Sequence, residues 1–210
     1  MNVMSPTDTL AHRRLPTILG LLCFVALWVL PIHAEVIVDI YQSGPNVLSS
    51  YSGTINLTDL AFLGEAGPTP AFITPDIATE VFEGTPGGAP VYGGITAPAD
   101  FGTGNETLAT TTAGDTFGFA GDGVEELLLP IGYISGSSIS GTDTWDGTSL
   151  AGLDLKAGTY TYTWGTGINA DSVVVNIGIA PVPEPSSLGL MSLVVLALVV
   201  LLRGRRASSV

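Results

Sequence analysis

Carboxylates are the main reactive side chains in the central part of this sequence. Between residues 35 and 180 there is no histidine, cysteine or arginine, and Lys156 is the sole basic residue. A Ser-His-Asp triad, a Cys-His dyad, a zinc centre with His or Cys ligands and an arginine clamp are therefore excluded for this part. We expect no catalytic residues there, and we expect Lys156 to lie on an exposed turn before a strand.

A pair of carboxylates is the catalytic arrangement that the composition still allows. Glycosidases place two such groups on either side of the scissile bond at a defined separation. The candidate pairs are Glu125 with Glu126 and Asp143 with Asp146, but closeness in sequence does not indicate the separation in space. Solvated acids in loops are the favoured interpretation, and a carboxylate-dependent glycosidase is the alternative.

Two glycine-containing stretches could also supply ligands for calcium, which takes six to eight oxygen atoms. The first contains Asp122 and Glu125, and the second contains Asp143 and Asp146, each placed by the sequence on a glycine-permitted turn. Neither stretch has the Asp-x-Asp-x-Asp-Gly spacing with its distal Glu. Calcium is therefore a possible ligand rather than a firm one, and no other cofactor is expected.

Threonine and aromatic residues alternate from Thr159 to Trp164. This period of two predicts a half-buried strand with one hydroxylated face and one aromatic face. The aromatic set Trp145, Tyr160, Tyr162 and Trp164 could stack on sugars, but large aromatic side chains on strands more often fill a core. Threonines can bind ice or sugar when they form a regular array over several stacked repeats. The sequence shows a single strand of this kind.

The charge of the chain bears on its partners. The formal net charge is −13, and a strongly anionic surface repels the phosphate backbone of nucleic acids. We therefore expect no nucleic-acid partner. The acidic composition favours solubility outside the cell.

Short runs of β-branched and aromatic residues, separated by Gly, Pro, Asn and Asp, occupy the segment from residue 35 to 180. We predict a single all-β domain there, a β-sandwich or jelly roll, large enough to bury a core without disulfides. Residues 64–98 are predicted to be mainly loops with one or two strands. The predicted strands are 35–41, 47–60, 117–120, 126–134, 159–164 and 172–179.

The N-terminal 34 residues have the three parts of a secretory signal peptide. Arg13 and Arg14 precede an apolar stretch over residues 18–30, and small Ala34 stands just before the expected cut. We predict cleavage between Ala34 and Glu35, which makes the export translocon and signal peptidase partners of the chain. An uncleaved N-terminal anchor is the alternative.

Residues 181–210 contain three consecutive features. An extended Val182-Pro183-Glu184-Pro185 motif precedes an apolar run at 186–202, which is long enough for a short transmembrane helix. The basic tail 203–210 then carries arginines that hold its end on the cytoplasmic side, namely Arg203, Arg205 and Arg206. A plain stop-transfer anchor is the alternative.

This order of motif, apolar run and basic end resembles the PEP-CTERM sorting signal of Gram-negative bacteria. The resemblance implies recognition by an exosortase, which would cut near residues 182–185. It also implies an inner-membrane-anchored precursor with a periplasmic domain, followed by delivery to the cell surface or the extracellular medium. Such proteins are associated with exopolysaccharide and biofilm, and some ice-binding proteins share the tail.

Three central segments, residues 129–136, 152–165 and 168–177, resemble a recurrent β-rich ectodomain of PEP-CTERM proteins whose function is unknown. That resemblance implies no particular activity. Our leading hypothesis is therefore a non-enzymatic, exported surface or matrix protein. A carbohydrate-, calcium- or ice-binding module is the alternative.

Overall fold

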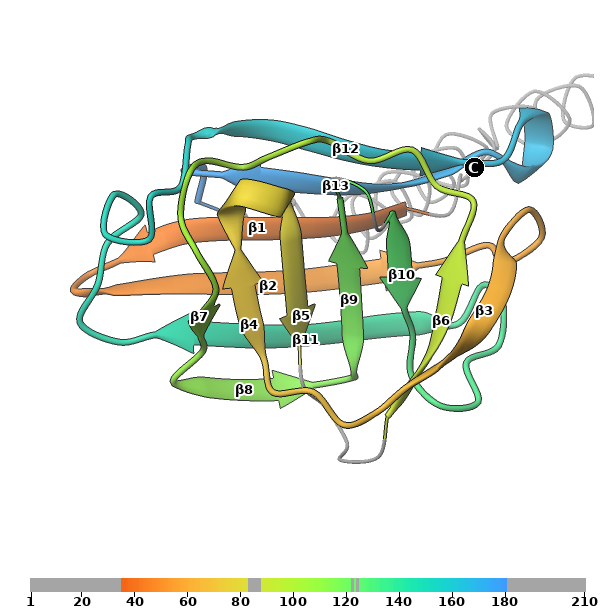
Figure 1. Cartoon of the computed structure of the whole chain (residues 1–210), viewed down its shortest axis with the longest axis horizontal. Helices are drawn as coiled ribbons and strands as arrows, with labels where there is room; N and C mark the ends of the chain where they lie inside the picture. The colour runs from red at the N-terminus through yellow and green to blue at the C-terminus, as the bar shows by residue number, and fades with distance from the viewer. Residues whose placement is uncertain (1–34, 83–87, 122, 124, 181–210) are drawn as a thin grey trace, which may run out of the picture.

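A computed structural model describes residues 35–82, 88–121, 123 and 125–180 of the chain (Figure 1). Within these residues the chain is almost entirely β-structure, and its strands form two sheets that pack as a sandwich. The prediction of an all-β domain is thus confirmed. The predicted signal peptide and the predicted sorting tail lie outside the described residues.

The first sheet has six strands. Two of its inner strands, β1 and β13, pair in parallel, although they come from opposite ends of the described sequence. The other neighbours pair antiparallel. In spatial order the strands are β12 (Gly158–Trp164), β13 (Asp171–Ile177), β1 (Glu35–Ser43), β2 (Asn46–Thr54), β11 (Ser138–Trp145) and β8 (Thr111–Gly114).

The second sheet has seven shorter strands, and Figure 1 shows them running across the direction of the six-stranded sheet behind them. Such crossed packing is one of the two common arrangements of stacked sheets. Short 3-10 helices follow β4 (η1, Pro75–Ile77) and β12 (η2, Gly167–Asn169). In spatial order the strands are β3 (Ala61–Ala66), β6 (Ala89–Gly93), β10 (Glu126–Leu128), β9 (Phe117–Ala120), β5 (Thr79–Phe82), β4 (Phe72–Thr74) and β7 (Thr107–Leu108).

The core lies between the two sheets and follows the period of two expected for strands. Along β1, the side chains of Val36, Val38 and Ile40 are buried, whereas those between them face outward. The seven-stranded sheet contributes mainly aromatic rings from β5 and β9. The burial of these large apolar surfaces is the main force that holds the two sheets together.

Strand β12 has the two faces that its sequence predicts. Tyr162 and Trp164 are buried in the core, and Tyr160 is half-buried against Phe101, with ring centroids 5.1 Å apart. The threonines between them are exposed. Trp145 on β11 is also buried, so the interpretation of these aromatics as core residues is confirmed.

The structure contains more strands than the sequence analysis predicts. Strand β11 was not predicted, because its inward positions include Gly141 and Asp143 as well as apolar residues, which hides the alternation. Residues 64–98 hold the end of β3 and all of β4, β5 and β6, so the prediction of one or two strands there is too low. Two predicted strands are too long: β2 ends at Thr54, and β10 ends before Pro130, which removes a backbone donor.

Candidate functional site

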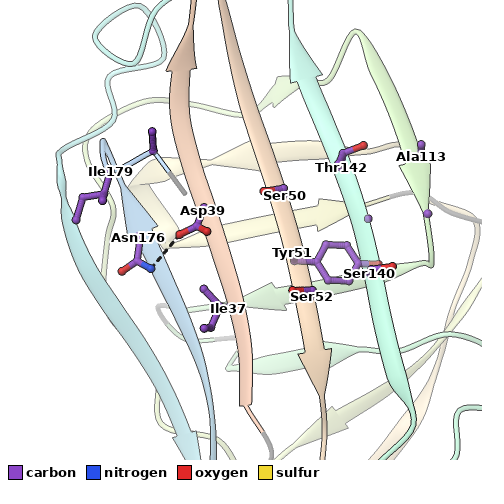
Figure 2. A pocket seen from close by; sticks show the side chains of 13 residues that line it. Ile37, Asp39, Ser50, Tyr51, Ser52, Ala113, Ser140, Thr142, Asn176 and Ile179 are labelled. Carbon is purple, nitrogen blue, oxygen red and sulfur yellow. Dashed lines mark hydrogen bonds between the residues drawn. The ribbon is translucent and has the colours of Figure 1, made fainter. Parts of the chain in front are cut away.

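The outer face of the six-stranded sheet is hollowed into a groove of about 690 Å³. Figure 2 shows its floor crossing β13, β1, β2 and β11, with Ile179 on one side and Ala113 on the other. We call it the outer-sheet groove; its floor side chains are Ile37, Asp39, Ser50, Ser52, Ser140, Thr142 and Asn176.

Strand alternation makes this face polar. In β2, Ser50 and Ser52 face outward on either side of the buried Tyr51. Strand pairing then aligns outward residues into rows that cross the sheet. Asn176 pairs with Asp39, Asp39 with Ser50, and Ser50 with Thr142. The neighbouring row is formed by Ile37, Ser52 and Ser140, so the groove presents hydroxyl, amide and carboxylate groups beside an aliphatic side chain.

A chain of side-chain hydrogen bonds fixes one end of the first row. The Asn176 Nδ2 donates to Asp39 Oδ1 at 3.0 Å, and the Thr159 hydroxyl donates to Asn176 Oδ1 at 3.0 Å. Both groups are therefore oriented before any ligand arrives, which reduces the entropy lost on binding. Asp39 is the one charged residue among the described residues that line the groove.

The ring of Tyr51 lies beneath the groove, under Gly141 of the neighbouring strand. A Cβ atom on Gly141 would lie 2.5 Å from Tyr51 Cε1, so only glycine leaves room for the ring at this position. The Tyr51 hydroxyl donates to the carbonyl oxygen of Asp115 at 2.6 Å. Burial, together with the charges of Asp115 and Asp143, raises the pKa of Tyr51. This tyrosine therefore stays neutral and serves as a rigid support of the floor.

This arrangement is suited to hydrogen bonding with a polyhydroxylated ligand. Serine and threonine hydroxyls both donate and accept, and an Asp-Asn pair offers an acceptor and an amide close together. Hydrolysis of a glycosidic bond requires two carboxyl groups at the reacting centre. The described lining of the groove contains one, Asp39. The groove thus offers hydrogen-bonding groups together with a single described carboxylate.

Two of the predicted calcium ligands, Asp143 and Asp146, lie in different surroundings. Asp143 lies within β11 and is fully buried, whereas Asp146 is exposed on the turn that follows. The prediction that Asp143 lies on a turn is therefore wrong, because the strand continues to Trp145. Glu125 is exposed, and Asp122 lies outside the described residues. Within the described part of the chain, no group of three or more His, Cys, Asp or Glu residues could hold a metal ion.

Two other predicted positions can be placed. Lys156 is exposed just before β12, as predicted, and its backbone NH donates to the Phe101 carbonyl at 2.7 Å. Glu35, on the C-terminal side of the predicted signal cleavage, is exposed and is the first residue of β1. Ala34 and the sorting residues Val182–Pro185 lie outside the described residues.

The groove residues were not predicted from the sequence. They come from four strands, and the parallel pairing of β1 with β13 joins positions 137 residues apart, as the hydrogen bond between Asp39 and Asn176 shows. A signal was nevertheless present: polar residues recur at every second position of predicted strands. That pattern marks a solvent-facing side, but it does not show which strands are neighbours.

None of the helices in the described residues is long and apolar enough to cross a membrane. The predicted transmembrane run, 186–202, lies beyond them.

Comparison with known proteins identifies the C-terminal segment. A family model for the PEP-CTERM protein-sorting motif matches residues 181–206. The match contains the predicted Pro-Glu-Pro motif, the apolar run and the three arginines, so the resemblance of the tail is confirmed. No curated protein and no solved structure matches the chain.

Proposed function

We propose that this chain, an exported protein with a PEP-CTERM sorting signal for processing by an exosortase, acts at the cell surface or in the extracellular matrix as a non-enzymatic glycan-binding protein. The observation that carries the proposal is the outer-sheet groove, with its rows of hydroxyl, amide and carboxylate groups. The association of PEP-CTERM proteins with exopolysaccharide agrees with such a ligand.

The charge of the protein favours a neutral glycan. A chain with a net charge of −13 repels anionic polymers. The groove itself carries one carboxylate, which Asn176 already engages. Sugar hydroxyls can pair with Asp39, Asn176 and the serine and threonine side chains without bringing a second negative charge. The aliphatic side chain of Ile37 offers a surface for the CH face of a sugar ring.

The proposed route to the surface begins with the translocon and signal peptidase, which remove residues 1–34 by cutting between Ala34 and Glu35. The precursor is then held in the inner membrane by residues 186–202, with the β-sandwich in the periplasm. The exosortase cuts near Val182–Pro185 and frees the sandwich. The last described residues, Ile179 and Ala180, line the groove, so the groove opens next to the point where the sorting tail joins the domain.

Replacing Asn176 by alanine is expected to weaken glycan binding at least about tenfold. The change removes one amide hydrogen-bonding group and releases the Asp39 carboxylate from its partner, and polar groups left unpaired on binding cost about 1–3 kcal/mol each. Affinity electrophoresis of the full chain in detergent, through gels that contain a neutral glucan, measures the effect. The expected result is strong retardation of the wild type and little of Asn176→Ala.

Asn105→Ala is the matched control, because Asn105 is exposed on the loop before β7 and does not line the groove. It should be retarded as the wild type is. Equal retardation of the wild type and Asn176→Ala would contradict the proposed site. Retardation that requires calcium and disappears with a chelator would instead favour calcium-bridged binding, and the release of reducing sugar ends would favour a glycosidase.

A further inference from the structure

Three polar side chains lie between the two sheets, where apolar packing is expected. Ser49, Glu80 and Asp143, which we call the core acid cluster, are all 0% exposed. Ser49 of β2 and Asp143 of β11 are direct neighbours in the six-stranded sheet. Glu80 of β5 points toward them from the other sheet.

The direction of Glu80 follows from strand alternation. It lies on the same face of β5 as Phe82, whose ring centroid is 4.5 Å from that of Tyr51 in the opposite sheet. Within its own sheet, Glu80 stands between Phe119 of β9 and Ile73 of β4, both fully buried. Its carboxyl group therefore enters an aromatic and aliphatic interior.

The surroundings of Glu80 contain no compensating positive charge. The sole basic residue of the described ranges, Lys156, is exposed on the surface. Neither carboxyl oxygen of Glu80 makes a well-formed hydrogen bond within the described residues, although the Ser49 hydroxyl lies nearby. An ionised carboxylate is strongly disfavoured at such a place, and buried acids respond by retaining their proton.

Both burial and the nearest acid keep Glu80 protonated. Burial is the main cause that raises the pKa of Glu80 well above its ordinary value of 4.5, and the negative charge of Asp143 raises it further. The Ser49 hydroxyl offsets part of this rise. Two tyrosines also lie near the cluster. Besides burial, the charge of Asp143 raises the pKa of Tyr51 on β2, and the charge of Glu80 raises that of Tyr162 on β12. Their hydroxyl protons are donated to backbone carbonyls, of Asp115 and Ala78 respectively.

We propose that Glu80 retains its proton between the two sheets, next to Asp143, so that the domain takes up a proton when it folds and the stability contributed by this side chain falls as its surroundings become less acidic. This inference is independent of the glycan-binding groove. It assigns to the fold a built-in response to pH, in which a buried carboxyl group holds the proton.

The sign of the response follows from linkage. An acid that is harder to ionise in the folded state binds more protons there than in the unfolded chain, so stability falls as the pH rises. The contribution of Glu80 is fully present below its ordinary pKa of 4.5. It is lost progressively as the pH rises toward and through the higher pKa of the folded state. The contribution of Glu80 to stability should therefore be greatest in acid.

Guanidinium unfolding of the full chain in detergent, followed by tryptophan fluorescence between about pH 4.5 and about pH 8, tests the proposal. Glu80→Gln keeps the shape of the side chain but carries no proton that can be lost. The unfolding equilibrium constant of the wild type, relative to that of Glu80→Gln, should rise about tenfold per pH unit above the ordinary pKa. Glu65→Gln, on the exposed edge strand β3, is the matched control and should follow the wild type.

Parallel pH profiles of the wild type and Glu80→Gln would overturn the proposal. Infrared spectroscopy of the wild type needs no variant and decides the case even if Glu80→Gln does not fold. A protonated-carboxyl C=O stretch should persist at neutral pH, where exposed acids are ionised, and its absence would contradict a retained proton. Loss of that band on addition of calcium, with a gain in stability, would show that the cluster binds a cation instead.

Discussion

Replacing Pro183, Glu184 and Pro185 together by alanine is expected to leave the protein in the membrane fraction and to abolish its release. These three residues are the core of the PEP-CTERM motif, which matches at residues 181–206. Alanine also lacks the restriction that proline places on its own backbone and on the residue before it. Cell fractionation and immunoblotting in cells that produce an exosortase measure the outcome.

The control for this experiment is the double variant Ser208→Ala, Ser209→Ala, which changes the tail beyond the matched residues and should be released normally. Both variants leave the β-sandwich unchanged, so a difference between them reports on sorting rather than folding. Release of the triple variant at the wild-type level would show that the tail acts as a plain anchor and that another signal directs release.

Truncation of Tyr162 to alanine is expected to destabilise the domain by about 3–5 kcal/mol, the usual cost of removing a buried aromatic side chain. Its ring is fully buried and lies 5.0 Å from that of Phe119 and 6.4 Å from that of Phe101, measured between centroids. Because small domains are stable by only about 5–15 kcal/mol, the exported protein should accumulate at a much lower level. The guanidinium midpoint measures the loss directly.

Two further variants separate the causes of that loss. Tyr162→Phe keeps the ring but removes the hydroxyl that donates to the Ala78 carbonyl, and should cost about 1–3 kcal/mol by leaving a buried acceptor unpaired. Thr161→Ala, the adjacent residue on the exposed face of the same strand, should change the midpoint little. A Tyr162→Ala midpoint close to that of the wild type would contradict the position of this ring at the centre of the core.

The parts of the fold that the sequence predicts are those where local pattern and burial agree. Strands β1, β9 and β12 alternate or cluster apolar residues, and their observed limits lie within two residues of the predicted ones. Strand β5 is buried on both faces although it contains Thr79 and Glu80. Strand β11 places Gly141 and Asp143 inward. In both cases the tertiary environment overrides the local pattern, and no periodicity in the sequence reveals it.

The same distinction applies to the functional residues. The sorting motif could be predicted because its meaning lies in the order of neighbouring residues along the chain. The groove could not, because Asp39 and Asn176 meet only after the first and last strands of the domain pair in parallel. For Asp143 the sequence predicts a site that the fold does not form. Its neighbours in sequence indicate a calcium ligand on a turn, whereas its neighbours in space are Ser49 and Glu80.

These features support one account of the protein. The C-terminal segment carries the sorting motif, and we propose that the N-terminal segment directs export and that the β-sandwich between them is the delivered product. That sandwich carries a polar groove on one face and a buried carboxyl pair at its centre. The route to the surface and the binding surface are separable, so a variant of Asn176 should be released normally, while a variant of Glu184 that is retained should still bind glycan.

Intact-mass spectrometry of the protein recovered from the surface or the medium of producing cells tests this account most directly, because it reports both cuts at once. The account predicts a mass that begins at Glu35 and ends near Pro185, without the apolar run and its arginines. Recovery of the chain with residues 1–34 or 186–210 still attached would contradict it.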